Sequence, residues 1–205
     1  MEAETLVGAE ALNAEDRARA DVYALLGALL AKPPEAAFLN RLRRIPVTDH
    51  DGDAGMTAAW ATLRQAADRA QVEALADEFH DLFVGLGRGE LAPYGSWYLT
   101  GFLMERPLAE LRVDVRRLGF ERRDDVHEPE DHAAALCETM SLIVADAAEI
   151  PFERQREFFA KHIAPWMGRF FGDLATAQSA RFYRAVGLLG ERFLEVERTV
   201  FSMLV

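Results

Sequence analysis

The densest group of possible metal ligands and charged side chains is the run His127-Glu128-Pro129-Glu130-Asp131-His132. Histidine and carboxylate side chains bind zinc and iron, so metal binding is the first chemistry to consider. A helical zinc site needs two histidines four residues apart on one face, whereas His127 and His132 are five apart with a proline between them. A di-iron bundle needs two Glu-x-x-His pairs, which the sequence lacks. The spacing therefore argues against both kinds of metal site.

Two other interpretations of this run stay open. In the structural one, Pro129 is the first residue of a helix, and Glu130 and Asp131 complement its positive end. His132 is then a core histidine on the buried face of the same helix. In the recognition one, the carboxylates of Glu128 and Asp131 accept hydrogen bonds from the guanidinium groups of a basic peptide.

An aromatic stretch, Leu91 to Tyr98, is predicted to be a loop. Pro93, Tyr94, Trp97 and Tyr98 could form the apolar half of a peptide groove, and ordinary core packing is the alternative.

Nucleophilic catalysis has little support. Gly95-Ser96-Trp97 lacks the second glycine and the preceding strand of a nucleophile elbow. Cys137 lies on the apolar stripe of a helix, where a thiol is usually inert. The alternative that stays open is a metal-dependent or nucleotide-dependent helical enzyme built around His127, His132 and His162.

Apolar residues recur at helical spacing along almost the whole chain, and no alternating strand pattern stands out. The sequence therefore predicts an all-α, single-domain bundle of about 8 to 11 helices. Its expected parts are residues 1–119, an acidic hinge loop at 120–128 just before Pro129, and residues 129–205. Thr48 to Gly55 is expected to be a polar turn, and Thr176 is expected to cap the last helix.

The charge balance indicates which partners to expect. The 34 acidic and 23 basic residues give a net charge of -11, which repels nucleic acid and anionic membranes and attracts basic ligands. A single cysteine cannot form an internal disulfide, which favours a reducing cytoplasm. No stretch of 18 apolar residues is present, so stable membrane insertion is not expected.

Several segments resemble the TorD/DmsD/NarJ family. Glu128-Pro129-Glu130-Asp131-His132 is similar to the family's Glu-Pro-x-Asp-His signature. Tyr23-Ala-Leu-Leu-Gly resembles the first helix of the family, and Phe79 to Gly85 with Pro93 to Tyr98 resembles its central helix and aromatic loop. Many TorD-type members have a glutamate between these aromatics, whereas this chain has Gly95, as in DmsD-type members.

The resemblance implies an all-helical cytoplasmic chaperone without catalytic activity. Such a chaperone binds the twin-arginine signal peptide of a molybdopterin-containing reductase, delays its export and assists cofactor insertion. It also implies a monomer or helix-swapped dimer, no cofactor, and at most weak binding of guanine nucleotide. The peptide-contacting candidates implied by the motifs are Tyr23, Pro93, Tyr94, Ser96, Trp97, Glu128, Asp131 and His132.

These residues give an expectation about salt. We expect Trp97→Ala to weaken peptide binding at any salt concentration, and Asp131→Asn to weaken it chiefly at low salt.

Overall fold

The computed structural model describes residues 13–47, 53–121 and 128–203. Within these ranges the chain forms ten α-helices, two five-residue π-helical turns (η1 and η2) and no β-strand, so the predicted all-α fold is confirmed. The elements are α1 (Ala14–Ala31), α2 (Ala36–Arg43), α3 (Ala54–Arg69), α4 (Val72–Phe79), η1 (His80–Val84), α5 (Gly95–Thr100), α6 (Arg106–Arg117), α7 (Ala133–Ala145), α8 (Phe152–Phe158), η2 (Phe159–Ile163), α9 (Met167–Thr176) and α10 (Phe182–Met203).

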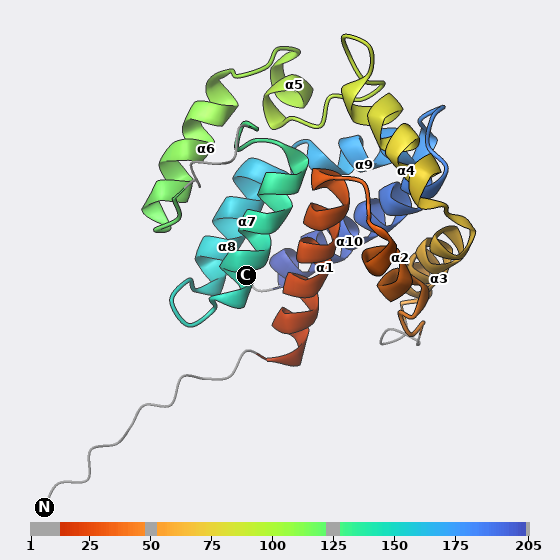
Figure 1. The fold of residues 1–205 in the computed structure, drawn as a ribbon. Helices are drawn as coiled ribbons and strands as arrows, with labels where there is room; N and C mark the ends of the chain where they lie inside the picture. Colours follow the sequence, from red (N-terminus) through yellow and green to blue (C-terminus); the bar gives the residue numbers. More distant parts are fainter. Residues whose placement is uncertain (1–12, 48–52, 122–127, 204–205) are drawn as a thin grey trace, which may run out of the picture.

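The pair α1 and α7 lies at the centre, with α8 beside α7 and α10 crossing behind α1 (Figure 1). Helix α10 contacts α9, α3, α4 and α1, so it joins the early and late helices. One hydrophobic cluster includes buried residues of α1, α3, α7, α9 and α10. Helices α5 and α6 lie at the upper left of Figure 1, while α2, α3 and α4 lie at the right. Most of the predicted hinge, residues 122–127, lies outside the described residues.

Several helices begin or end beside residue types that commonly mark helix ends. Asn13 caps α1, because its side chain accepts a hydrogen bond from the Asp16 amide at 2.7 Å. Pro107 lies in the first turn of α6. Gly85 and Gly119 have φ angles of 62° and 82° and follow η1 and α6, where a left-handed residue ends a helix.

Helices α9 and α10 approach closely at two glycines. A methyl group on Gly190 would overlap the ring of Phe171, and one on Gly187 would overlap the backbone of Ala175. Larger residues at these two positions would therefore separate the helices.

The predicted cap of the last helix is wrong. Thr176 is the last residue of α9 and does not cap α10. The start of α10 is instead capped by the Glu78 carboxylate of α4, which accepts hydrogen bonds from the amides of Arg181, Phe182 and Tyr183 at 2.7, 3.2 and 2.8 Å. This cap comes from a residue about 100 positions away, so no local pattern indicates it.

The predicted turn from Thr48 to Gly55 is also only partly correct. Helix α3 already begins at Ala54, with Asp53 as its N-cap, and residues 48–52 lie outside the described part of the chain. Every helix in the described residues is too short or too polar to cross a bilayer.

Candidate functional site

The structure brings the aromatic segment and the Glu-Pro-x-Asp-His segment together. Tyr94 and His132 form an isolated antiparallel bridge. The Ala133 amide donates to the Pro93 carbonyl, and the Gly95 amide donates to the Asp131 carbonyl, both at 2.8 Å. We call residues 93–96 and 128–132 together the Asp131 site. Two motifs that are about 35 residues apart in sequence therefore form one surface.

The carboxylate of Asp131 is buried, with 3% of the residue exposed. Its Oδ2 accepts a hydrogen bond from the Ser96 amide at 2.8 Å, which caps the start of α5. Its Oδ1 and the buried Oγ of Ser96 have no hydrogen-bond partner among the described residues. Because a buried polar atom is usually paired, this unused carboxylate oxygen is a feature to be explained.

This cap also corrects the predicted loop. The structure places Gly95 to Tyr98 in helix α5, so the aromatic loop ends at Tyr94. The amides that start α5 find acceptors on Asp131, which lies on another segment, and the local sequence carries no such signal.

His132 does not lie on the buried face of a helix, so the core-histidine interpretation is wrong. It is the N-cap of α7, where its Nδ1 accepts a hydrogen bond from the Ala134 amide at 3.1 Å. Pro129, Glu130 and Asp131 therefore precede the helix and do not form its first turn. Burial lowers the pKa of His132, although the nearby Glu128 and Asp131 oppose this effect.

Tyr94 connects the two segments at the rim. Its hydroxyl donates to the carboxylate of Glu128 at 2.6 Å, and its ring contacts the His132 ring edge-on at 5.0 Å between centroids. Burial and the Glu128 carboxylate both raise the pKa of Tyr94, so its hydroxyl stays protonated. Glu128 itself is exposed and lies on the solvent side of the Asp131 site.

Gly95 allows α5 to lie against Trp166. A methyl group on Gly95 would lie 3.1 Å from the indole nitrogen and 3.6 Å from Cβ of Asp131. The Trp166 side chain is buried, and its indole N–H donates to the His162 carbonyl at 2.8 Å. A glutamate in place of Gly95, as described above for many TorD-type members, would therefore require Trp166 to move.

A cavity of about 90 Å³ lies between α5, α6, α7 and η2. Its lining includes Leu99, Glu110, Asp131, Lys161, His162 and Trp166. The ammonium of Lys161 and Nε2 of His162 lie 2.6 and 2.9 Å from the Asp114 carboxylate. Asp114 is therefore the partner of both side chains, whereas Asp131, which also lines the cavity, has one buried carboxylate oxygen without a partner.

The residues of the aromatic segment that were predicted to contact a peptide are only partly accessible to one. Pro93 is buried, and the Trp97 ring is covered by the guanidinium of Arg88 at 4.3 Å from the ring centre. The Tyr98 hydroxyl donates to Asp173 at 2.9 Å. These side chains therefore have partners within the chain.

Tyr23 lies elsewhere. It is fully buried, and its hydroxyl donates to the Glu197 carboxylate of α10 at 3.0 Å. The same carboxylate accepts a hydrogen bond from buried Arg19 at 2.7 Å. The structure therefore places Tyr23 in the core between α1 and α10, and not in the Asp131 site.

An exposed apolar surface beside α5 was missed by the sequence interpretation. It consists of Leu99, Phe102, Leu103 and Met104, which are 43%, 68%, 47% and 73% exposed. We call these four residues the apolar loop. The signal was a run of large apolar residues around Gly101, of which Phe102, Leu103 and Met104 lie between α5 and α6 and belong to no helical stripe.

Of the three histidines of the enzyme alternative, the two that the structure describes have separate partners. His132 caps α7, His162 binds Asp114, and His127 lies outside the described residues. In the part of the chain that the structure describes, no group of three His, Cys, Asp or Glu side chains could hold a metal ion. Burial raises the pKa of Cys137, which is consistent with an unreactive thiol.

Comparisons with known proteins agree on one family. The family model described as the nitrate reductase delta subunit matches residues 49–172 of the 205. The chaperone protein TorD of Vibrio cholerae strain O395 is 26% identical over 154 residues, which is 70% of each chain. TorD of Aliivibrio fischeri is 25% identical over 208 residues, covering 91% of this chain and 95% of that protein.

A solved structure shares the fold. The crystal structure of a protein described as a redox enzyme maturation protein, from Archaeoglobus fulgidus, matches with a TM-score of 0.55 and 18% identity. The match covers 86% of this chain and 93% of that one. Because the family model spans more than half of the sequence, the chain belongs to the nitrate reductase delta subunit family of maturation chaperones, which includes TorD and is not a family of enzymes.

Proposed function

We propose that this protein is a system-specific chaperone for a molybdopterin-containing oxidoreductase of the DMSO reductase type. It binds the twin-arginine signal peptide of the precursor in the cytoplasm, delays its export, and assists folding and cofactor insertion. The family supports the general role, and the Asp131 site supports the peptide as the ligand.

The observation that carries this proposal is the unpaired oxygen of Asp131. A carboxylate that is 3% exposed loses most of its hydration, and here only Oδ2 has regained a hydrogen bond. A guanidinium group would supply the missing donors, since its planar fork matches a carboxylate. A cavity of about 90 Å³ corresponds to roughly three water volumes, which suits the four heavy atoms of a guanidinium.

The second support is that the cavity lined by Asp131 adjoins the apolar loop. Leu99 lines the cavity beside Asp131 and is also the first residue of the apolar loop. A signal peptide with arginines followed by an apolar stretch matches this order, with an arginine in the cavity and the apolar stretch on Phe102 and Met104. Glu128 at the rim is placed to attract the basic segment before it docks.

The binding experiment uses synthetic peptides and fluorescence anisotropy. The test peptide carries Arg-Arg followed by ten apolar residues, and the controls replace Arg-Arg by Lys-Lys or Gln-Gln. We expect the Arg-Arg peptide to bind most tightly, the Lys-Lys peptide less tightly and the Gln-Gln peptide least, because only arginine offers a bidentate fork. Equal affinity for the Arg-Arg and Gln-Gln peptides would reject the Asp131 site as an arginine site.

The client class is tested separately by co-purification. Protein isolated from its native cell is expected to carry a molybdoenzyme precursor with its signal peptide intact. Recovery of the mature enzyme alone, lacking the signal peptide, would contradict the proposed role before export.

A further inference from the structure

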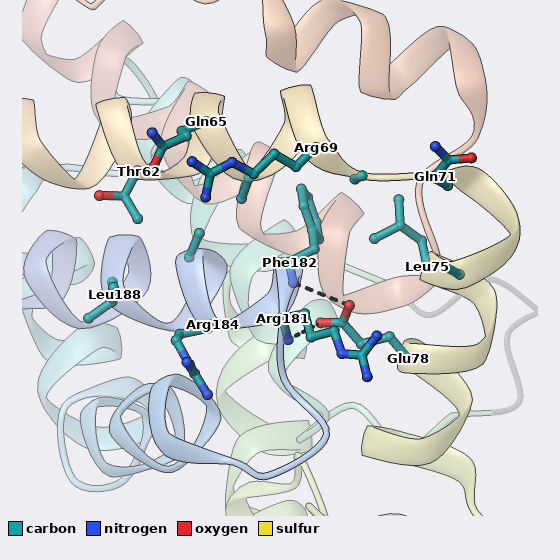
Figure 2. A pocket seen from close by; sticks show the side chains of 14 residues that line it. Thr62, Gln65, Arg69, Gln71, Leu75, Glu78, Arg181, Phe182, Arg184 and Leu188 are labelled. Carbon is teal, nitrogen blue, oxygen red and sulfur yellow. Dashed lines mark hydrogen bonds between the residues drawn. The ribbon is translucent and has the colours of Figure 1, made fainter.

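A second pocket of ligand size is formed by other helices than those around the Asp131 site. Its volume is about 420 Å³, and it is formed by the second half of α3, by α4 and by the start of α10 (Figure 2). Arg69 comes from α3, whereas Arg184 lies on α10 and Arg181 just precedes it. We call the pocket with these three residues the arginine pocket. Figure 1 places α3 and α4 on the right, away from α5 and α6.

The charge of this pocket differs from that of the whole protein. Three arginines line it against one acidic residue, Glu78, although the chain carries a net charge of -11. Glu78 is 9% exposed and its carboxylate is occupied by three backbone amides of the α10 start. The local excess of positive charge is therefore not neutralised by the pocket itself.

The three guanidinium groups make no ion pair or side-chain hydrogen bond with any described residue. Other arginines of the chain do, such as Arg19 with Glu197 and Arg192 with Asp53. Arg69, Arg181 and Arg184 are exposed, so their donors are free for an incoming ligand. Guanidinium groups bind carboxylates with two parallel hydrogen bonds, which makes an anionic ligand the matching class.

The form of the pocket favours an extended anion. Because Glu78 accepts hydrogen bonds from the amides of Arg181, Phe182 and Tyr183, these N–H groups are not available to a single phosphate. In Figure 2, Arg69 extends from α3 on one side and Arg184 from α10 on the other. Leu188, which is 41% exposed, and half-buried Ala66 also line the pocket and add apolar surface to it.

We propose that the arginine pocket is a docking site for an acidic peptide segment of a partner protein, with carboxylates on Arg69 and Arg184 and apolar side chains on Ala66 and Leu188. This site is independent of the twin-arginine site and goes beyond the proposed function. Charge complementarity attracts the segment, and the apolar contacts hold it.

The test uses a fluorescein-labelled peptide with the sequence Glu-Leu-Leu-Glu-Glu-Leu-Leu-Glu and the full-length chain. A peptide with glutamine in place of every glutamate is the charge control. We expect the acidic peptide to bind, and the double variant Arg69→Gln/Arg184→Gln to weaken its binding by about tenfold, since two exposed ion pairs are lost. The weakening should shrink as salt is added.

The matched control is Arg17→Gln/Arg116→Gln, which removes the same charge from exposed residues of α1 and α6. It should change the affinity by less than about twofold. The proposal is overturned if the two double variants behave alike, if the glutamine peptide binds as tightly as the acidic one, or if inorganic tripolyphosphate binds and the acidic peptide does not. Binding of the Arg-Arg peptide should stay unchanged in both double variants, which separates this result from the Asp131 site.

Discussion

The Asp131 site and the arginine pocket both carry unpaired charge, but they hold it in different surroundings. The unpaired oxygen of Asp131 is buried, whereas the guanidinium groups of Arg69, Arg181 and Arg184 are exposed. A buried charge has a large interaction energy with a partner and is little affected by salt. An exposed charge interacts weakly and is screened. We therefore expect the buried Asp131 site to select its ligand and the exposed arginine pocket mainly to attract one.

The burial of Asp131 changes the expected salt dependence of peptide binding. The sequence alone suggested that Asp131→Asn would weaken peptide binding chiefly at low salt. Since Asp131 is buried, its contribution should persist at high salt, and the salt-sensitive part should come from exposed Glu128.

The largest effect is expected from Asp131→Asn. The amide oxygen can still accept the Ser96 hydrogen bond, but the negative charge facing the arginine is lost. A charged hydrogen bond contributes about 1.5 to 3 kcal/mol, so the Arg-Arg peptide should bind roughly 10 to 100 times more weakly. Anisotropy at about 0.05 M and about 0.5 M salt should give similar losses.

The matched control is Glu128→Gln at the rim of the Asp131 site. It should weaken binding only a few-fold at low salt and hardly at all at high salt. If Asp131→Asn loses its effect at high salt as Glu128→Gln does, the buried-arginine arrangement is wrong.

The next largest effect is a loss of stability when the Glu78 cap beside the arginine pocket is removed. Glu78→Ala removes the acceptor for three amides at the start of α10. We expect it to lower the free energy of unfolding by about 2 kcal/mol and the Tm by about 4 to 8 °C. Thermal unfolding followed by circular dichroism measures this.

Glu90→Ala is the control for Glu78. Glu90 also accepts two backbone hydrogen bonds, from Gln178 and Ser179, but it is exposed. Glu90→Ala should lower the free energy of unfolding by less than half as much as Glu78→Ala, because water can replace the exposed acceptor. Equal costs would mean that burial of Glu78 adds nothing to the α10 cap.

A smaller effect on binding is expected in the apolar loop. Phe102→Ser removes an exposed ring of the apolar loop and should weaken binding of the Arg-Arg peptide about fivefold to tenfold, independently of salt. Leu86→Ser is the control, because Leu86 is fully exposed but lies after η1 and outside the apolar loop. The same loss in both variants would show that the apolar contribution is not local.

The smallest effect is a pH dependence from His132. Burial lowers its pKa in the folded state below the ordinary value of 6.5, so the unfolded chain takes up the proton first as the pH falls. Protonation also removes the Nδ1 acceptor of the Ala134 amide. The contribution of His132 to stability is therefore complete well above pH 6.5 and is lost as the pH falls below it.

His132→Asn keeps an N-cap without a titrating group. Wild type and variant should be about equally stable at about pH 7.5, and wild type should lose roughly 1 kcal/mol relative to the variant at about pH 5. Urea unfolding at both pH values compares them, and parallel loss in the two proteins would exclude His132 as the titrating group. His162, whose pKa burial also lowers, is present in both and cancels.

Some helix boundaries depend on signals that lie within a few residues of them. The cap of α1 at Asn13 and the position of Pro107 in the first turn of α6 are examples. The errors at Thr176 and Gly95 share another cause. At both places a helix start depends on a partner that is distant in sequence.

The sequence by itself determined the all-α class, the family motif Glu128 to His132, and the acidic charge that favours a basic ligand. These follow from periodicity, spacing and composition, which are properties of neighbouring residues or of sums over the chain. Only the tertiary structure decided that Asp131 is buried with one oxygen unpaired, that Tyr23 belongs to the core, and that Arg69 and Arg184 line one pocket. Burial and pairing depend on which helices come together, and that is determined by packing over the whole chain.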